Sequence, residues 1–184
     1  MLERVAMTDL AFTIRNETVE DALAIERLHE RTFGPGRYAL TAYRLRERVG
    51  HDLGLSFTAR VGTLLVGSVW MTPILIGSAK AMLLGPLTVE PPFRGHGIAV
   101  ALIQRALAEA KAEGHRLVLL VGDEPYYGKR GFMQVPKGQI KFPGPVDPAR
   151  LMLAELEEGA FAGVTGLVRP DWDATEPDEQ AEQA

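Results

Sequence analysis

The sequence predicts a three-layer α/β domain (α+β mixed) in which a mixed sheet lies between helices. Two observations support this fold class. Three consecutive segments rich in Val, Leu, Ile and Thr, separated by short glycine turns, indicate an antiparallel meander. A long amphipathic segment then leads into a short continuous apolar run, which is typical of a helix followed by a buried parallel strand.

The first elements are a strand at residues 12–15 and two helices. Thr18 is a suitable N-cap with Asp21 three residues later, and apolar residues follow at helical spacing until Gly34-Pro35-Gly36 breaks the pattern. A second amphipathic helix is expected at residues 40–49 and ends at Gly50.

The meander comprises strands at residues 55–61, 64–76 and 80–89. Gly62-Thr63 and Gly77-Ser78 suit hairpin connections between them. Pro73 interrupts the middle strand, so we expect a bulge or an edge position there.

The second half begins with the long helix, expected at residues 97–113 and closed by Gly114. The apolar run at residues 117–121 is the expected parallel strand. A short helix at residues 125–130, a strand around residues 132–135 and a final strand near residues 151–156 complete the prediction.

The length and composition fit one domain. With 184 residues, 46% of them apolar, the chain can build a packed core. We expect a single domain over residues 1–174, followed by an acidic, polar and disordered tail at residues 175–184.

Several classes of function are disfavoured by the composition. The net charge of −4 argues against nucleic acid or an anionic membrane as the main partner. The chain has no cysteine and its four histidines are scattered, so we expect no metal site. It shows neither a secretory signal nor an apolar run of ~20 residues, and a cytoplasmic location is therefore expected.

The chemistry is expected in the stretch from Leu84 to Ala99, which reads LGPLTVEPPFRGHGIA. It predicts a strand, a glycine-rich loop and a helix N-terminus. Gly95 and Gly97 allow the backbone to approach a ligand closely, and the first amides of the helix have no intrahelical partner. Such a loop suits a pyrophosphate, and Arg94 would add a charge-assisted contact. The same glycines also fit a tight strand-to-helix turn without a ligand.

Two other phosphate motifs match poorly. A dinucleotide-binding fingerprint needs glycine at position 100, which is Val100, and a loop that starts directly after the strand. The stretch from Gly122 to Lys129 has one residue too many for a Walker A loop, and Arg130 replaces its Ser or Thr.

These residues resemble the GCN5-related N-acetyltransferase (GNAT) family, and within it a YhbS-like bacterial subgroup. Arg94, Gly97 and Ala99 match the family's cofactor signature, after a strand that reads LGPLTV. A second signature, an aromatic residue followed four residues later by Gly-Phe, is matched by Tyr127 and Gly131-Phe132. The resemblance covers residues 12–135, and more loosely extends to Val168.

The resemblance implies a mostly antiparallel sheet whose fourth and fifth strands splay apart to hold acetyl-coenzyme A (acetyl-CoA), with no metal. The pantetheine arm would pair with the backbone of the fourth strand, one N–H of which would face the oxyanion, and the loop would hold the pyrophosphate. The implied cofactor residues are Leu87, Thr88, Val89, Arg94, Gly95, His96, Gly97, Ile98, Ala99 and Val100.

Tyr127 resembles the family's general acid, which protonates the departing thiolate, although a packing role also fits a tyrosine at this position. The acceptor would be a primary amine of a small molecule or a protein. Its implied pocket residues are Phe33, Arg37, Tyr38 and Glu124, with residues 136–148 as a lid or wall.

The general base is left open. Some family members carry a glutamate on the fourth strand, but residues 80–83 contain no carboxylate. Glu124, Glu30 or a water relay are the alternatives, and Glu90 lies past the catalytic part of the strand. The missing carboxylate also keeps open an acyl-CoA sensing module without efficient turnover. A transferase with a longer acyl donor is a third hypothesis. The sequence does not decide between a monomer and a homodimer.

Overall fold

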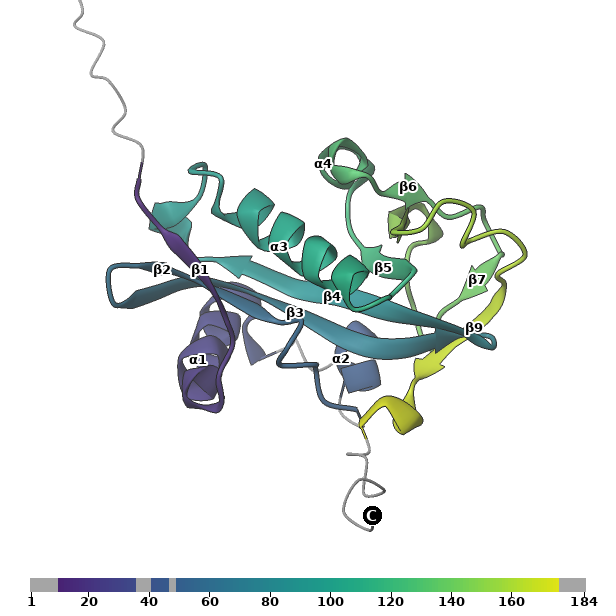
Figure 1. The fold of residues 1–184 in the computed structure, drawn as a ribbon, viewed down its shortest axis with the longest axis horizontal. Helices are drawn as coiled ribbons and strands as arrows, with labels where there is room; N and C mark the ends of the chain where they lie inside the picture. Colours follow the sequence, from purple (N-terminus) through teal and green to yellow (C-terminus); the bar gives the residue numbers. More distant parts are fainter. Residues whose placement is uncertain (1–9, 36–40, 47–48, 176–184) are drawn as a thin grey trace, which may run out of the picture.

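The chain folds around a nine-stranded sheet with helices on both faces (Figure 1). The computed structural model describes residues 10–35, 41–46 and 49–175. Helix α3 covers one face of the sheet, and α1 and α2 cover the other, which gives the three predicted layers. Arg37, Tyr38, part of the predicted second helix and the predicted tail from residue 176 onward lie outside the described residues.

The N-terminal elements follow the predicted order. Strand β1 (Thr13–Asn16) pairs antiparallel with β2 (Phe57–Val61). The N–H of Thr18 donates to the carboxylate of Asp21 at 3.1 Å, which caps the turn before helix α1 (Ala22–Phe33). Helix α1 ends at Gly34, whose φ of 68° lies in the left-handed region that glycine tolerates. Helix α2 (Thr41–Arg46) follows.

The predicted meander is confirmed. Strand β3 (Leu64–Ile76) pairs antiparallel with β2 on one side and with β4 (Ala79–Val89) on the other. Pro73 lies where β2 has already left the edge of β3 and β9 has not yet joined it, so its missing N–H costs no ladder hydrogen bond. The irregularity in the β3–β4 register lies between Val69 and Met71 rather than at Pro73.

Helix α3 (Ile98–Ala112) packs an apolar stripe onto the sheet. Its buried residues recur at helical spacing and form one core with side chains of β2 to β5: Ile98, Leu102, Ile103, Ala106 and Ala110. The helix leads into β5 (Leu117–Val121), which pairs in parallel with β4, as the apolar run predicts.

The C-terminal third contains two strands that the sequence analysis did not predict. The predicted short helix is present as α4 (Glu124–Tyr127) with a following 3-10 turn, and the two predicted strands are β6 (Met133–Gln134) and β8 (Leu151–Glu155). The unpredicted strands are β7 (Ile140–Lys141) and β9 (Gly166–Pro170), which pair with each other in parallel. Strand β9 also pairs with β3. Among the described residues, no helix is both long and apolar enough to cross a membrane.

The contact between β4 and β5 is short, and this creates the site. The two strands pair only at Met82 with Val118 and at Leu83 with Leu119. Beyond these pairs β4 continues along β3, while β5 continues along β8. The central sheet therefore opens at the carboxyl end of β5, as the family resemblance implies.

Candidate active site

Two cavities meet at the opening between β4 and β5. The first, of about 500 Å³, lies between the end of β4, the loop before α3 and the start of α3. The second, of about 630 Å³, lies between β4, the end of β5 and the segment before β8. Four of the described residues line both cavities and therefore form their common wall: Phe33, Leu87, Tyr126 and Tyr127.

The first cavity, which we call the loop cavity, has a wall of exposed backbone amides. Gly95 and Gly97 have φ values of 81° and 82°, which a residue with a side chain rarely adopts. The chain thereby turns directly into α3, whose first N–H groups have no intrahelical acceptor and carry the positive end of the helix dipole. This wall is chemically suited to a phosphate or pyrophosphate group.

The edge of β4 forms a second wall of the loop cavity. Because the N–H of Glu90 donates to Val66 of β3 at 2.8 Å, the backbone groups of Leu87 and Val89 point the other way, toward the opening. The carbonyl of Val89 accepts a bond from Nε of Arg94 at 3.0 Å, which keeps this guanidinium at the edge of the cavity. An extended ligand could pair with the groups of this strand edge that β3 does not bind, while Arg94 binds the Val89 carbonyl.

Arg130 also lines the loop cavity, and the sequence analysis did not assign it a binding role. Its guanidinium lies 3.6 Å from the centre of the Tyr126 ring and donates to the Tyr126 carbonyl. Its Nε is buried and finds no hydrogen-bond partner among the described residues. A buried donor of this kind is normally satisfied by water or by a ligand, so Arg130 adds positive charge and an open donor. Its place directly before Gly131-Phe132 was the available signal.

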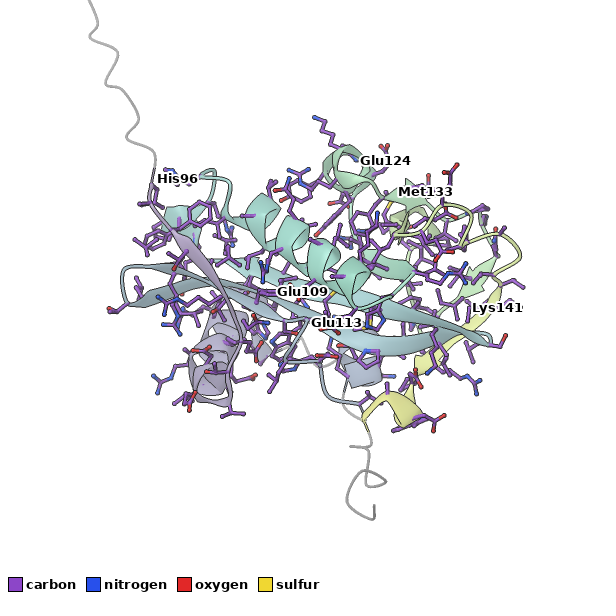
Figure 2. All side chains as sticks on the ribbon, viewed as in Figure 1. His96, Glu109, Glu113, Glu124, Met133 and Lys141 are labelled. Carbon is purple, nitrogen blue, oxygen red and sulfur yellow. The ribbon has the colours of Figure 1, made fainter. Side chains whose placement is uncertain are left out.

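The structure brings the expected cofactor residues together, with one exception. All of them except His96 line the loop cavity. His96 is half-buried on the loop before α3, and Figure 2 shows it well apart from α4, where Glu124 is labelled.

The second cavity, which we call the side-chain cavity, is lined mainly by apolar groups from several elements. Leu83, Leu84 and Pro86 come from β4, and Phe142 and Val146 come from the segment after β7. The proline- and glycine-rich segment that was expected to form a lid or wall thus lines the cavity. The described residues of this lining also include four charged ones: Arg46, Asp123, Asp147 and Arg150.

The carboxylates near the site differ from those considered in the sequence analysis. Asp123 and Asp147 line the side-chain cavity, and Asp123 pairs with Arg150 at 3.0 Å. Glu124 lines a separate shallow hollow of about 690 Å³ beside Gly128 and Met133. Glu90 forms an ion pair with Arg31, and neither Glu90 nor Glu30 lines any of these cavities.

Tyr127 stands at the junction of the two main cavities. Its ring packs edge-on against Tyr126 at 4.9 Å and against Phe132 at 5.9 Å between ring centroids. Burial, and then the neighbouring Tyr126 and Asp123, raise the pKa of the Tyr127 phenol to about 12. The phenol is therefore protonated at neutral pH and available as a proton donor.

Metal ligands were not expected, and the described residues contain no group of three or more His, Asp or Glu side chains that could hold a metal ion. The residues that line the two cavities offer anion binding, pairing along a strand edge and proton donation by a phenol.

Known acetyltransferases are similar to this chain in sequence. The family model described as "Acetyltransferase (GNAT) family" matches residues 22–132. The N-acetyltransferase YhbS of Escherichia coli K12, described as uncharacterized, is 30% identical over 157 residues, covering 84% of this chain and 93% of that protein. The N-acetyltransferase YjhQ of the same organism, also described as uncharacterized, is 28% identical over 76% of this chain and 78% of its own length.

Solved structures of acetyltransferases share the fold of this chain. The crystal structure of E. coli YhbS in complex with CoA superimposes with a TM-score of 0.75 at 25% identity, covering 90% of this chain and 92% of that one. A GNAT-family acetyltransferase from Brucella melitensis, in complex with acetyl-CoA, gives a TM-score of 0.56 at 28% identity, covering 83% and 99%. The fold, the opened sheet and these similarities lead to one conclusion: the chain belongs to the GNAT family of N-acetyltransferases.

Proposed function

We propose that this protein transfers the acetyl group of acetyl-CoA to a primary amine by direct attack in a ternary complex. The observation that carries the proposal is the junction of the two cavities at Leu87 and Tyr127. One cavity has the amides and cations that a diphosphate requires, and the other has room for a second substrate. A thioester at the junction would be accessible from both.

The loop cavity is the proposed site of the cofactor. The first amides of α3 hold the pyrophosphate, Arg94 and Arg130 add charge, and the backbone of Leu87 and Val89 pairs with the pantetheine arm. The complexes of E. coli YhbS with CoA and of the Brucella protein with acetyl-CoA support this cofactor class.

The reaction then proceeds at the junction. The neutral amine attacks the thioester carbon, the oxyanion is stabilised by an N–H of β4 near Leu87, and the C–S bond breaks as the C–N bond is retained. Tyr127 gives its phenolic proton to the departing sulfur and regains one from solvent. The ammonium proton of the acceptor leaves to solvent through water in the side-chain cavity.

The side-chain cavity favours a small acceptor. Its volume of about 630 Å³ lies within the usual range for small-molecule sites, and most of its lining is apolar. Arg46 is half-buried among the described residues of this lining, and the planar fork of a guanidinium matches the geometry of a carboxylate or phosphate. We therefore favour an apolar amine that carries an anionic group over a protein side chain as the acceptor.

An acyl-CoA sensing module is the second candidate. It is motivated by the absence of a carboxylate on residues 80–83 of β4, where the buried residues Ala81, Met82 and Leu83 lie. In that case the protein would bind the cofactor without passing the acetyl group on. A transferase for a longer acyl donor would need additional space beside the thioester. Rates measured with acyl-CoA donors of increasing chain length would test this alternative.

Two measurements test the proposal. Calorimetric titration with CoA measures binding, and release of free thiol from acetyl-CoA in the presence of an amine panel measures transfer. We expect binding together with amine-dependent thiol release. Binding with no release above hydrolysis for any amine would favour the sensing module, and no binding at all would refute both candidates.

A further inference from the structure

The ring of Tyr127 occupies space that any side chain at position 122 would need. Gly122 follows directly after β5, and a Cβ atom at this position would lie 2.2 Å from Cε2 and 2.5 Å from Cδ2 of Tyr127. Non-bonded carbon atoms prefer separations of about 3.5–4.0 Å. The ring and a side chain at position 122 therefore exclude each other.

The backbone of Gly122 does not itself require glycine. Its φ is not among the positive values found at other glycines of the chain. Its N–H donates to the carbonyl of Arg150 at 2.8 Å, which fixes this residue against the start of β8. Alanine would thus fit the local conformation, and the main obstacle to it is the Tyr127 ring. The tip of Leu120, at 3.0 Å, would have to move only slightly.

We propose that Gly122 is a positioning residue that holds the phenol of Tyr127 at the junction of the two cavities. Tyr126 and Phe132 make edge contacts with the Tyr127 ring, and the ring also lies directly against the Cα of Gly122. This inference rests on the proposed function, because it assigns Tyr127 the role of proton donor.

A methyl group at position 122 has a defined consequence. The ring borders both cavities, so it can swing into open space instead of forcing the backbone apart. The phenol then leaves the junction and becomes more hydrated. Gly122→Ala should lower kcat about 10- to 100-fold, since general-acid catalysis is worth ~10²–10⁴-fold, and the KM for acetyl-CoA should rise only if the ring enters the loop cavity.

The position of the ring can also be measured without any acceptor. Ultraviolet absorbance at alkaline pH reports tyrosine ionisation, and subtraction of the Tyr127→Phe curve isolates the Tyr127 signal. Because burial is the main cause of the raised pKa, the Tyr127 phenol should titrate at lower pH in Gly122→Ala than in the wild type. An unchanged titration together with unchanged turnover would overturn the proposal.

A double-mutant cycle separates positioning from a general effect of the methyl group. In a Tyr127→Ala background the ring is gone, so Gly122→Ala should cause no further loss of kcat. An equal loss in both backgrounds would show that Gly122 acts independently of Tyr127 and would refute the inference. Gly50→Ala is the control for an added methyl, because a Cβ at position 50 meets no atom of the described residues within 4 Å.

Two further outcomes remain informative. If Gly122→Ala alone fails to fold, the Tyr127→Ala double variant should restore folding because it removes the clash, and failure of both would contradict the inference. If the wild type acetylates no amine, the proposed function fails, and with it the claim that the position of the Tyr127 ring matters for catalysis. The absorbance titration then still decides whether Gly122 positions the ring.

Discussion

The two cavities are built in different ways, and this difference explains what each contributes. The loop cavity takes most of its lining from one continuous stretch, Leu87 to Val100, and presents backbone amides to its ligand. The side-chain cavity combines segments from α1, α2, β4, the end of β5 and residues 142–150. A backbone site tolerates many side chains and suits one constant ligand, such as the proposed cofactor. A site made of side chains from distant segments can change its specificity while the fold is retained.

The largest expected effect is at the common wall. Tyr127→Phe keeps the ring and its packing but removes the proton donor, so kcat should fall ~10²–10³-fold while the affinity for CoA stays nearly constant. Steady-state kinetics with calorimetry would show this split. Tyr126→Phe is the matched comparison, since Tyr126 lines the same wall. A loss confined to Tyr126→Phe would transfer the role of acid to that residue.

The two cavities also differ in how much of each could be predicted from the sequence. The loop cavity follows from local sequence, because a strand, two glycines with positive φ and a helix start are all encoded between Leu84 and Ala99. The sequence analysis did not place Arg130 in the loop cavity, although it lies between Tyr127 and Gly131-Phe132, which carry the second family signature. Its role depends on the bend that brings the 3-10 turn after α4 to the start of α3.

The side-chain cavity was only outlined from sequence, because its walls depend on long-range pairing. Strand β9 pairs with β3 across about ninety residues of chain, and its sequence GLVRP has no alternating apolar pattern. Strand β7 is two residues long, too short for any periodic signal. The sequence analysis considered Asp123 only as part of a dinucleotide-binding motif. In the structure it follows β5 and lines the side-chain cavity.

The second prediction concerns the backbone site alone. Gly97→Ala places a side chain at a φ of 82°, which costs roughly 1–2 kcal/mol for an L-residue or forces the loop to move. We expect CoA to bind about 10- to 30-fold more weakly by calorimetry, with kcat at saturating acetyl-CoA changed far less. Since Gly97 is not among the residues that line the side-chain cavity, the proposed acceptor site, the KM for the amine should be unaffected. Unchanged CoA affinity would argue against this loop as the pyrophosphate site.

The third prediction concerns the side-chain cavity alone. Arg46→Gln removes the half-buried cation, so the KM of an amine with a carboxylate should rise about tenfold, which matches a lost charge-assisted hydrogen bond. The same amine without its carboxylate should be affected less than twofold, and so should CoA binding. Kinetics with such a matched pair of amines gives the measurement. Equal effects on both amines would mean that Arg46 supports the wall of the cavity rather than the substrate.

The smallest expected effect is on stability at alkaline pH, and it tests whether the junction is dry. The native pKa of Tyr127, about 12, exceeds the value near 10 expected in the unfolded chain. Between these values the unfolded state releases its proton first, so the stability present below pH ~10 is lost as the pH rises toward ~12. At pH ~10.5 this loss amounts to about 0.8 kcal/mol. The free energy of unfolding in urea is measured for the wild type and Tyr127→Phe at pH 8 and at pH ~10.5. The difference between the two proteins in their loss of stability isolates the contribution of Tyr127, because all other titrating groups are shared. If both proteins lose stability equally, the phenol titrates like an exposed tyrosine, and the common wall is open to water even without substrates.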